Sequence, residues 1–224
     1  LICGAPITYR AESSIQTCSI CHKEQLTNAV CENSHFICDA CHSYGTYAPV
    51  IAALRDSTEK DALLLLEKIM DLPSVHMHGP EHHAIVPCVL LTAFRNNGEH
   101  MNYDAALSEI CKRAKQVPGG TCGYWGVCGA AAGTGIFMSV MTGSSPLHKD
   151  AWPFPQKLVS IILSRLADVG GPRCCKRTSR IAIEEAVHFY SQFCSVNIPL
   201  SSITCKYCED NRECIQEDCP YYSE

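Results

Sequence analysis

The sequence lacks the features of a secreted, membrane-spanning or nucleic-acid-binding protein. Its start, LICGAPITYR, has no basic segment, no long apolar segment and no small-residue cleavage site of the kind that marks a signal peptide. Its most apolar stretch, residues 129–143, is too short and too rich in glycine to span a bilayer. Basic residues are not in excess either, since the formal net charge is −5. We therefore expect a cytoplasmic protein that binds neither membranes nor nucleic acids.

The composition also excludes disorder as the main description. Hydrophobic residues make up 46% of the 224 residues and charged residues only 18%, which is enough to bury one good core. Three regions differ in character: residues 1–43 are polar with a formal charge of −2, residues 44–200 carry +1, and residues 201–224 carry −4. The sequence predicts an N-terminal module, a middle domain and a tail with these bounds.

Cysteine is abundant, with seventeen residues in the chain. An odd number fits poorly with complete disulfide pairing. Ten of the seventeen lie near the two ends, and both end groups contain CxxC pairs, which have the spacing of metal ligands. Thiolate metal sites persist best in a reducing compartment, so this distribution agrees with a cytoplasmic protein.

The N-terminal module contains two CxxC pairs separated by sixteen residues, a spacing typical of a zinc ribbon or treble clef. Four thiolates around one zinc ion leave no position for a substrate, so we predict a structural zinc site. Cys31 and His35 lie between the pairs, and each is able to replace one ligand or to join Cys3 in a second site. The four predicted ligands are Cys18, Cys21, Cys38 and Cys41.

The middle domain is expected to be mainly helical. Apolar residues recur at i, i+3 and i+4 in several segments, and alternation typical of strands is scarce. Thr58 and Asp61 have the spacing of a capping box, and Pro80 suits the first position of a helix. The overall fold class is therefore mainly α, with a small zinc-ribbon-like or treble-clef-like module before the helices and a cysteine-rich tail after them. The helical segments are residues 58–70, 80–95, 103–117, 155–168 and 178–193.

The tail repeats the cysteine pattern with longer loops. Its final Cys-Pro is typical of ferredoxin-type clusters, although the spacing is wider than in bacterial ferredoxins. Zinc, a [4Fe–4S] cluster and two local disulfides all fit this pattern, and a reducing cytoplasm disfavours the disulfides. The candidate ligands are Cys205, Cys208, Cys214 and Cys219.

A histidine-rich segment, residues 75–83, is the first candidate for chemistry in the middle domain. It places His78, His82 and His83 at a turn and the start of a helix, where neutral imidazoles are favoured and are available as bases or metal ligands. The alternative is an ordinary solvated helix start. The segment is not HExxH, so a zinc protease is not indicated.

Two cysteine-containing segments are the other candidates. Cys122 and Cys128 lie in the glycine-rich run GGTCGYWGVCG, which offers N–H groups to an anionic ligand or allows close helix packing. The run lacks a P-loop lysine and a dinucleotide fingerprint. Cys174 and Cys175 lie in GGPRCCKRT beside basic residues at a helix start, so we expect their thiolates to be favoured and to act as ligands or nucleophiles. The cysteines on apolar helical stretches, Cys88, Cys111 and Cys194, are expected in the core.

Several of these segments together resemble a known family. CSICHKEQ, HFICDACH, HGPEHHAIVP, GTCGYWGVCGAA, GGPRCCKR and CIQEDCP are similar to an uncharacterised cysteine-rich domain family of anaerobic microbes, and the resemblance covers nearly the whole chain. Some members are attached to methyltransferase-like domains. The resemblance therefore implies a methyltransferase-like or other protein partner.

A second resemblance concerns chemistry. PEHHAIVPCVLL, CGYWGVCGAAAGTG and VGGPRCCKRTSRIAIEEA occur in the same order as segments of the iron–sulfur L-serine dehydratase catalytic domain, an all-helical domain related to L-cysteine desulfidase. The resemblance implies a [4Fe–4S] cluster with one open iron and a small-molecule substrate that loses a hydroxyl or thiol. The implied ligands are Cys122 or Cys128, Cys174 and Cys175, and the candidate bases are His78, His82 and His83.

Three functions are consistent with these patterns. The first is a metal-binding protein with structural zinc and an iron–sulfur or second metal site, acting as a lyase of the dehydratase or desulfidase kind. The second is a non-catalytic metal-binding module that docks to a methyltransferase or another partner. The third is a thiol redox or persulfide carrier that uses Cys174 and Cys175.

Overall fold

The chain folds into two compact units. A computed structural model describes residues 1–193 and 195–223. The N-terminal unit comprises Leu1–Tyr44, and the helical unit comprises Gly45–Glu224. The cysteine-rich tail thus belongs to the same compact body as the helices. Cys194, which the sequence assigns to the core, lies outside the described residues.

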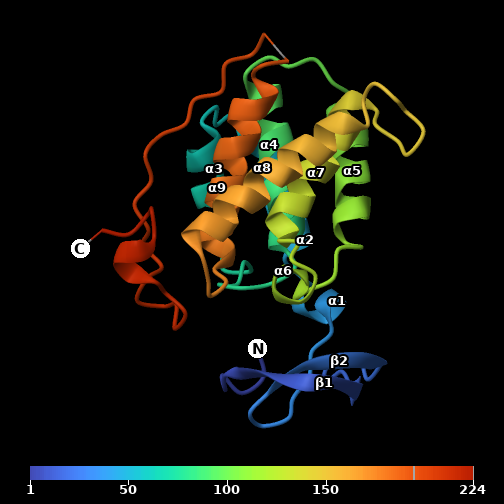
Figure 1. The fold of residues 1–224 in the computed structure, drawn as a ribbon, viewed down its shortest axis with the longest axis vertical. Coiled ribbons are helices and arrows are strands. Elements are labelled where there is room, and N and C mark those ends of the chain that lie inside the picture. Colours follow the sequence, from blue (N-terminus) through green and yellow to red (C-terminus); the bar gives the residue numbers. More distant parts are fainter. Residues whose placement is uncertain (194, 224) are drawn as a thin grey trace. The chain divides into compact units, whose positions relative to one another are not determined.

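A two-stranded antiparallel hairpin forms most of the N-terminal unit (Figure 1). β1 (Ile7–Thr17) pairs with β2 (Glu24–Cys31), and a short helix, α1 (Asp39–His42), follows. The pairing register shifts between Tyr9 and Ser14, which marks a bulge. An isolated hairpin of this kind is marginally stable in water, so the unit needs a further source of stability.

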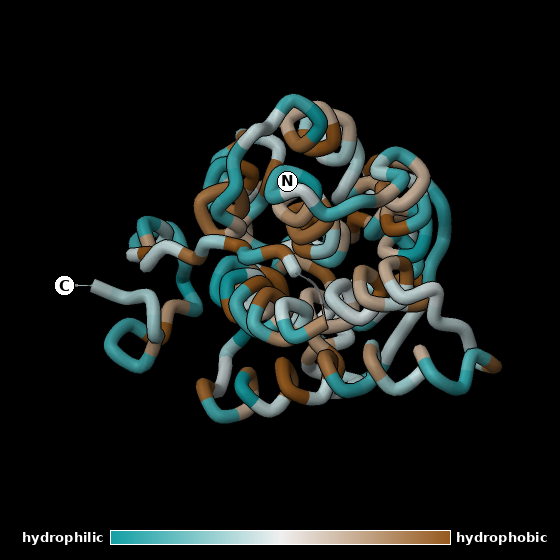
Figure 2. Tube along the Cα trace, turned by 90° about the horizontal axis from the view of Figure 1, so that it is seen from above, coloured by the Kyte–Doolittle hydropathy of each residue, from teal (hydrophilic) through white to brown (hydrophobic). Residues whose placement is uncertain are grey.

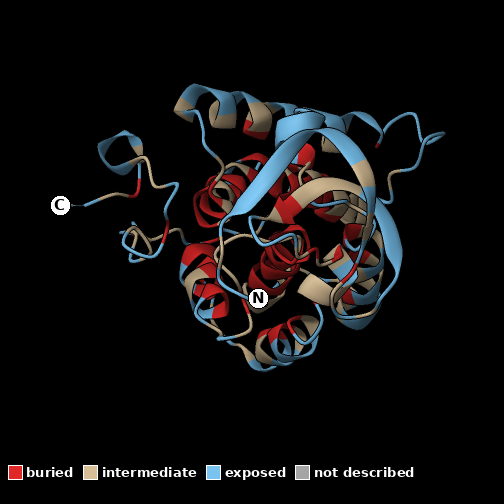
Figure 3. Ribbon diagram, turned by 90° about the horizontal axis from the view of Figure 1, so that it is seen from below, coloured by how far each residue is buried: buried red, intermediate tan, exposed pale blue. Residues whose placement is uncertain are grey.

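The core of the N-terminal unit is very small. Figure 3 shows the hairpin mostly in the colour of exposed residues, in agreement with the exposure of β1 along nearly its whole length. Its buried apolar cluster contains Val30, Phe36, Cys18 and Cys38. Because two of these side chains are thiols, hydrophobic burial alone gives the unit little stability, and a metal cross-link would add to it.

Helices joined by turns and irregular segments make up the helical unit, so the expectation of a mainly helical chain is confirmed. The last regular element in the described part of the tail is the short 3₁₀ helix η1 (Gln216–Asp218). The helices are α2 (Tyr47–Asp56), α3 (Ala62–Met70), α4 (His82–Asn96), α5 (Tyr103–Ala114), α6 (Thr121–Tyr124), α7 (Gly129–Thr142), α8 (Pro153–Val169) and α9 (Cys175–Tyr190).

Helix α4 lies at the centre of the helical unit. Every residue from His82 to Phe94 is buried, and α4 contacts α2, α3, α5, α7 and α9. A helix that is buried on all sides is a core helix. Phe94 stacks on Phe137 of α7 and meets Tyr190 of α9 edge-on, with ring centroids 5.6 and 4.7 Å apart. Figure 2 shows hydrophobic segments (brown) alternating with hydrophilic ones (teal) along the helical tubes.

Two tyrosines of the tail cover a buried ion pair. Arg180 of α9 donates two hydrogen bonds to Glu67 of α3, at 2.7 and 2.9 Å, and its side chain is fully buried. The rings of Tyr207 and Tyr221 lie over the guanidinium carbon of Arg180, at 5.6 and 5.3 Å. Their hydroxyl groups donate to Asp71 at 2.7 Å and to Glu184 at 2.9 Å. The tail is therefore fixed to α3 and α9 by aromatic and charged contacts.

Two helices begin later than the sequence predicts. Asp61 is the N-cap of α3, and its carboxylate accepts hydrogen bonds from two backbone N–H groups at 2.9 and 3.0 Å. The capping box at Thr58 is therefore wrong, because a carboxylate three residues later caps the helix. Helix α4 begins at His82, since Pro80 lies in the turn that precedes it.

No helix in residues 1–193 and 195–223 is both long enough and apolar enough to cross a membrane.

Candidate metal centres

The two CxxC pairs converge in the N-terminal unit. Cys18 directly follows β1, Cys38 is the N-cap of α1, and Cys41 lies within α1. The four sulfur atoms, including that of Cys21, all lie within 4.8 Å of one another, and those of Cys21 and Cys38 are 3.8 Å apart. Sulfur ligands of a tetrahedral zinc ion also lie about 3.8 Å apart, because each is about 2.3 Å from the metal. The four-cysteine site therefore has the spacing of a single bound ion.

Backbone hydrogen bonds stabilise the thiolate form of one of these cysteines. Burial alone would raise the pKa of Cys18, but N–H groups of Cys21, Cys38 and Ile20 lower that pKa to about 6. Burial and the neighbouring thiols raise the pKa of Cys41 to about 12. Without a cation the first thiolate thus opposes ionisation of the others, whereas a divalent cation would stabilise all four.

Three cysteines from three separate elements of the helical unit interact through Cys128, and we call them the helical-unit thiols: Cys122, Cys128 and Cys175. Cys122 lies on α6, Cys128 is the N-cap of α7 and Cys175 is the first residue of α9. The charge of Cys128 interacts with those of both other thiols, and its sulfur also contacts the hydroxyl of Thr178. In the described chain they do not belong to a group with all donor atoms within 4.8 Å, so their spacing is wider than around a single ion.

Burial favours the protonated form of two of these thiols, Cys128 and Cys175. It raises the pKa of Cys128, although backbone N–H groups at the start of α7 oppose the rise. It also raises the pKa of Cys175 to about 12, although the N–H of Gly79 opposes it. A bound metal would remove this penalty, because metal coordination deprotonates a thiol.

The adjacent residues Cys174 and Cys175 face different surroundings. Cys174 is the N-cap of α9, where its sulfur accepts the N–H of Arg177 at 3.4 Å, and its charge interacts with Cys205 of the tail. Cys175 instead faces Gly79 and Cys128. The structure thus separates two cysteines that the sequence grouped together.

The expectation of favoured thiolates at this helix start is wrong. Burial raises the pKa of Cys174 as well as that of Cys175. The nearby cations are engaged with carbonyl groups instead: Lys176 Nζ donates to a backbone oxygen of α3 at 3.0 Å, and Arg177 donates to those of Gly170 and Pro172 at 2.9 and 2.8 Å.

His82 is a buried hydrogen-bonding bridge. Its Nε2–H donates to the carbonyl of His76 at 3.0 Å, so its Nδ1 accepts from the hydroxyl of Ser179 at 3.3 Å. Burial, together with the positive charge of Lys176, lowers the pKa of His82 to about 4. The ring is neutral near pH 7 and has both nitrogen atoms occupied.

His83 faces the start of α7. Its Nδ1–H donates to the carbonyl of Val117 at 3.0 Å, which leaves Nε2 as the basic nitrogen of the neutral ring. The ring lies directly against Gly129, where a Cβ atom would come within 2.1 Å of Nε2. Since Cys128 precedes this glycine, His83 lies close to one of the helical-unit thiols.

His78 lies against the tail. Its Nε2 is 3.1 Å from Asn211 Oδ1 and 3.3 Å from Glu213 Oε2. Burial and the charge of Arg173 lower the pKa of His78, while Glu213 opposes that shift. This histidine therefore joins the helix start to the tail.

The tail cysteines lie in irregular turns. The N–H of Cys205 donates to the carbonyl of Tyr221 at 2.6 Å, and the sulfur of Cys205 accepts a hydrogen bond from the Arg180 side chain. The sulfur of Cys214 accepts the N–H of Gln216 at 3.4 Å. Within the described residues, Cys205, Cys208, Cys214 and Cys219 do not bring their sulfur atoms into one group within 4.8 Å.

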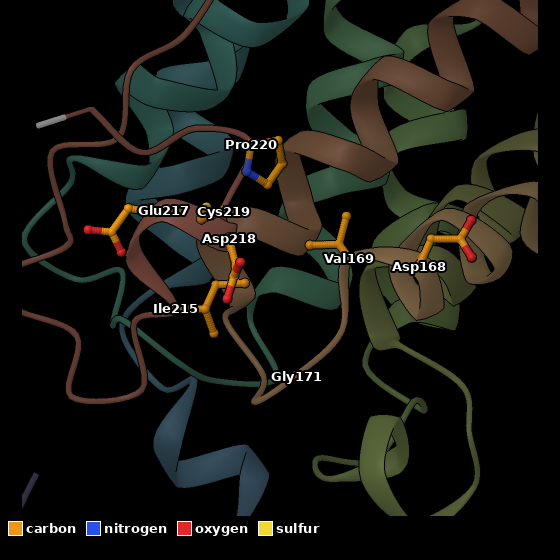
Figure 4. Close-up of a pocket in the computed structure, with 8 residues that line it drawn as sticks. All are labelled: Asp168, Val169, Gly171, Ile215, Glu217, Asp218, Cys219 and Pro220. Atoms are coloured by element: carbon orange, nitrogen blue, oxygen red, sulfur yellow. The ribbon is translucent and has the colours of Figure 1, made fainter.

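A cavity of about 430 Å³ separates the end of α8 from the tail (Figure 4). Asp168 and Val169 line it from α8, Gly171 from the following turn, and Ile215 and residues 217–220 from the tail. Cys219 is the one predicted ligand among these lining residues. The cavity therefore lies apart from the helical-unit thiols.

Two hydroxyl groups near these residues were not singled out by the sequence. Thr178 contacts Cys128, and Ser179 contacts His82. They lie three and four positions after Cys175, so all three share one face of α9. This helical spacing was the available signal.

One known protein family matches most of the chain. A model described as a family of unknown function, DUF5714, matches residues 50–222. The chain belongs to DUF5714. No curated protein and no solved structure matches the chain. The DUF5714 match includes the helical-unit thiols and the tail, and the four-cysteine site lies before its first residue. The resemblance to L-serine dehydratase and the link to methyltransferases stay hypotheses.

Proposed function

We propose that this protein binds zinc through Cys18, Cys21, Cys38 and Cys41, and that the ion holds the N-terminal unit in its folded form. The convergence of the four sulfur atoms within 4.8 Å carries this proposal. A closed set of four thiolates suits zinc and leaves no position for a substrate. The small core of the unit supports a structural role, because little else opposes unfolding of the hairpin.

Zinc content of the full chain tests this proposal. Cys21→Ser and Cys41→Ser should each release one zinc ion per chain and destabilise the N-terminal unit, and elemental analysis after gel filtration measures the zinc content. Cys111→Ala, which alters a half-buried cysteine of the helical unit, should keep wild-type zinc. Equal zinc in wild type and in the Cys21→Ser/Cys41→Ser double variant would contradict the proposal.

We propose as a second function that the helical-unit thiols hold an iron–sulfur cluster used in elimination or sulfur chemistry. The electrostatic interactions of Cys128 on α7 with Cys122 of α6 and with Cys175 of α9 support this site. Ligands of a cluster bind different iron atoms, so they lie farther apart than ligands of one ion. The three donor atoms do not all lie within 4.8 Å of one another, which is wider than a single zinc ion requires.

Within this proposal, His83 is the base. A bound cluster with an open iron would supply a Lewis acid for a leaving hydroxyl or thiol. The carbonyl of Val117 accepts a hydrogen bond from His83 Nδ1, and the ring lies beside Gly129, the residue that follows Cys128. His82 is assigned a structural role, because both of its ring nitrogens are hydrogen-bonded within the core.

Anaerobic purification of the full chain tests the second function. We expect iron and acid-labile sulfide in the wild type, their loss in Cys128→Ser and Cys175→Ser, and their retention in Cys174→Ser, which faces the tail. Protein that contains zinc and no sulfide would contradict the cluster. Activity that alkylation abolishes in iron-free protein would favour a thiol or persulfide carrier. Binding of a methyltransferase by folded, iron-free protein would favour a docking module.

A further inference from the structure

A second set of metal-binding groups lies in the N-terminal unit, outside the four-cysteine site. The donor atoms of Cys3, Cys31 and His35 all lie within 4.8 Å of one another. Cys3 is exposed, and Cys31 and His35 are partly buried. These residues therefore form a compact set at the surface of the unit.

The distances among these atoms match three corners of a zinc tetrahedron. The sulfur atoms of Cys3 and Cys31 are 3.7 Å apart, and Cys31 Sγ is 3.4 Å from His35 Nδ1. With zinc–sulfur and zinc–nitrogen bonds of about 2.3 and 2.0 Å, tetrahedral ligands lie about 3.8 Å apart for two sulfurs and about 3.6 Å for sulfur and nitrogen. Both observed distances agree with a single bound ion.

The local backbone turns Cys31 and His35 toward the same point. Cys31 ends β2, and its N–H donates to the carbonyl of His35 at 3.0 Å. The N–H of His35 in turn donates to Cys31 Sγ at 3.2 Å. Ser34 adopts a φ of 62°, which closes this tight turn. N–H donation to a sulfur stabilises its thiolate form, as a metal ligand requires.

Cys3 is fixed from a different part of the chain. The side-chain amide of Asn33 donates to its sulfur at 3.6 Å. The backbone N–H of Ala5 also donates to this sulfur. The N–H of Glu32 donates to the carbonyl of Pro6 at 3.0 Å, which holds the two chain segments together.

A disulfide explains this arrangement less well. The sulfur atoms of Cys3 and Cys31 are 3.7 Å apart, whereas a disulfide bond is about 2.0 Å long. A disulfide would also leave no role for the nitrogen of His35, which points to the same sulfur.

We propose that Cys3, Cys31 and His35 bind a second zinc ion, with a water molecule or another donor group as the fourth ligand. The four-cysteine site joins the turn end of the hairpin, since Cys18 directly follows β1. The second site joins the open end, where Ile7 pairs with Cys31. Two ions would thus cross-link both ends of a hairpin that has little core of its own.

The test compares zinc content among full-length variants. His35→Asn and Cys31→Ser should each contain one zinc ion per chain fewer than the wild type. His22→Asn is the matched control, because His22 is an exposed histidine of the same unit whose φ of 59° asparagine tolerates. It should keep wild-type zinc. Equal zinc content in wild type, His35→Asn and Cys31→Ser would overturn the proposal.

Cobalt substitution separates this site from the four-cysteine site. Cys41→Ser should leave a cobalt spectrum of two thiolates and one imidazole, and His35→Asn should leave that of four thiolates. If Cys41→Ser unfolds the unit, His35→Asn alone still decides, because it leaves the four-cysteine ligands unchanged. A wild-type mass lower by two hydrogen atoms, together with equal zinc content in wild type, His35→Asn and Cys31→Ser, would show a disulfide and overturn the proposal. A spectrum altered by added cyanide identifies the fourth ligand as water.

Discussion

At the scale of single residues, the imidazole of His83 packs directly against Gly129. A Cβ atom at position 129 would come within 2.1 Å of the imidazole. Gly129→Ala should therefore lower the free energy of unfolding by about 1–3 kcal/mol, because a buried ring must move. Urea denaturation measures the change.

Gly123→Ala is the control for that substitution. A Cβ atom there meets nothing within 4 Å, so the free energy of unfolding should change by less than about 0.5 kcal/mol. Equal effects of the two substitutions would show that the His83 contact contributes nothing.

His82 predicts a pH dependence of stability. Its pKa is about 4 in the folded chain against 6.5 for the free side chain, so only the unfolded state gains a proton between these values. Stability should fall by about 1.4 kcal/mol per pH unit as the pH drops from 6.5 to 4, relative to His82→Gln. Above pH 6.5 the two curves should run parallel. Charges of Lys176, Glu81 and His83 act on this ring.

Denaturant titrations at several pH values measure this dependence. Substitution of the exposed His188 by glutamine provides the control and should leave the slope unchanged. A His82→Gln slope that equals the wild-type slope would mean that the buried ring titrates normally.

At the scale of elements, the tail is expected to stabilise α3 and α9. Tyr221 is 5% exposed, covers Arg180 and donates to Glu184. Tyr221→Ala should lower the free energy of unfolding by about 2–4 kcal/mol and make the tail sensitive to proteases. Leu147→Ala, at a side chain that is 95% exposed, should change neither. A protease-resistant tail in Tyr221→Ala would contradict this role.

The periodicity of apolar residues located α3, α4, α5, α8 and α9, because each places apolar residues at helical spacing in the core. It did not reveal α7, whose three glycines have low helix propensity. Packing overrides that propensity: Gly133 lies against the backbone of α4, and Gly135 against Val159 of α8. Glycines are typical of turns in a sequence, but in α7 their lack of side chains allows close contact between helices.

The candidate sites also differ in how far the sequence could predict them. The four-cysteine site was predictable because CxxC places two ligands within one local turn. The proximity of Cys128 and Cys175 depends on how α7 packs against α9, which no local pattern contains. Likewise, sequence adjacency hid the divergence of Cys174 and Cys175, since consecutive residues at a helix start point in different directions.

At the scale of the whole molecule, the two units should respond differently to metal removal. The N-terminal unit has a four-residue buried apolar cluster, whereas the helical unit has a large continuous core. A strong zinc chelator should therefore abolish amide-exchange protection in Leu1–Tyr44 and leave that of α4 intact. Hydrogen exchange followed by mass spectrometry of peptides measures amide protection in both units in one sample. Protection that persists in β1 and β2 after complete zinc removal would contradict this expectation.

The tail contacts also bear on how the protein is made. Glu67 is translated well before Arg180, and Tyr207 and Tyr221 leave the ribosome after both. During synthesis the ion pair of α3 and α9 is therefore open to water until the tail emerges, whereas all ligands of the N-terminal unit are available early. Metal loading of the first unit can precede completion of the second, so a nascent chain stalled before residue 207 should carry a metal-bound hairpin on an unfinished helical body.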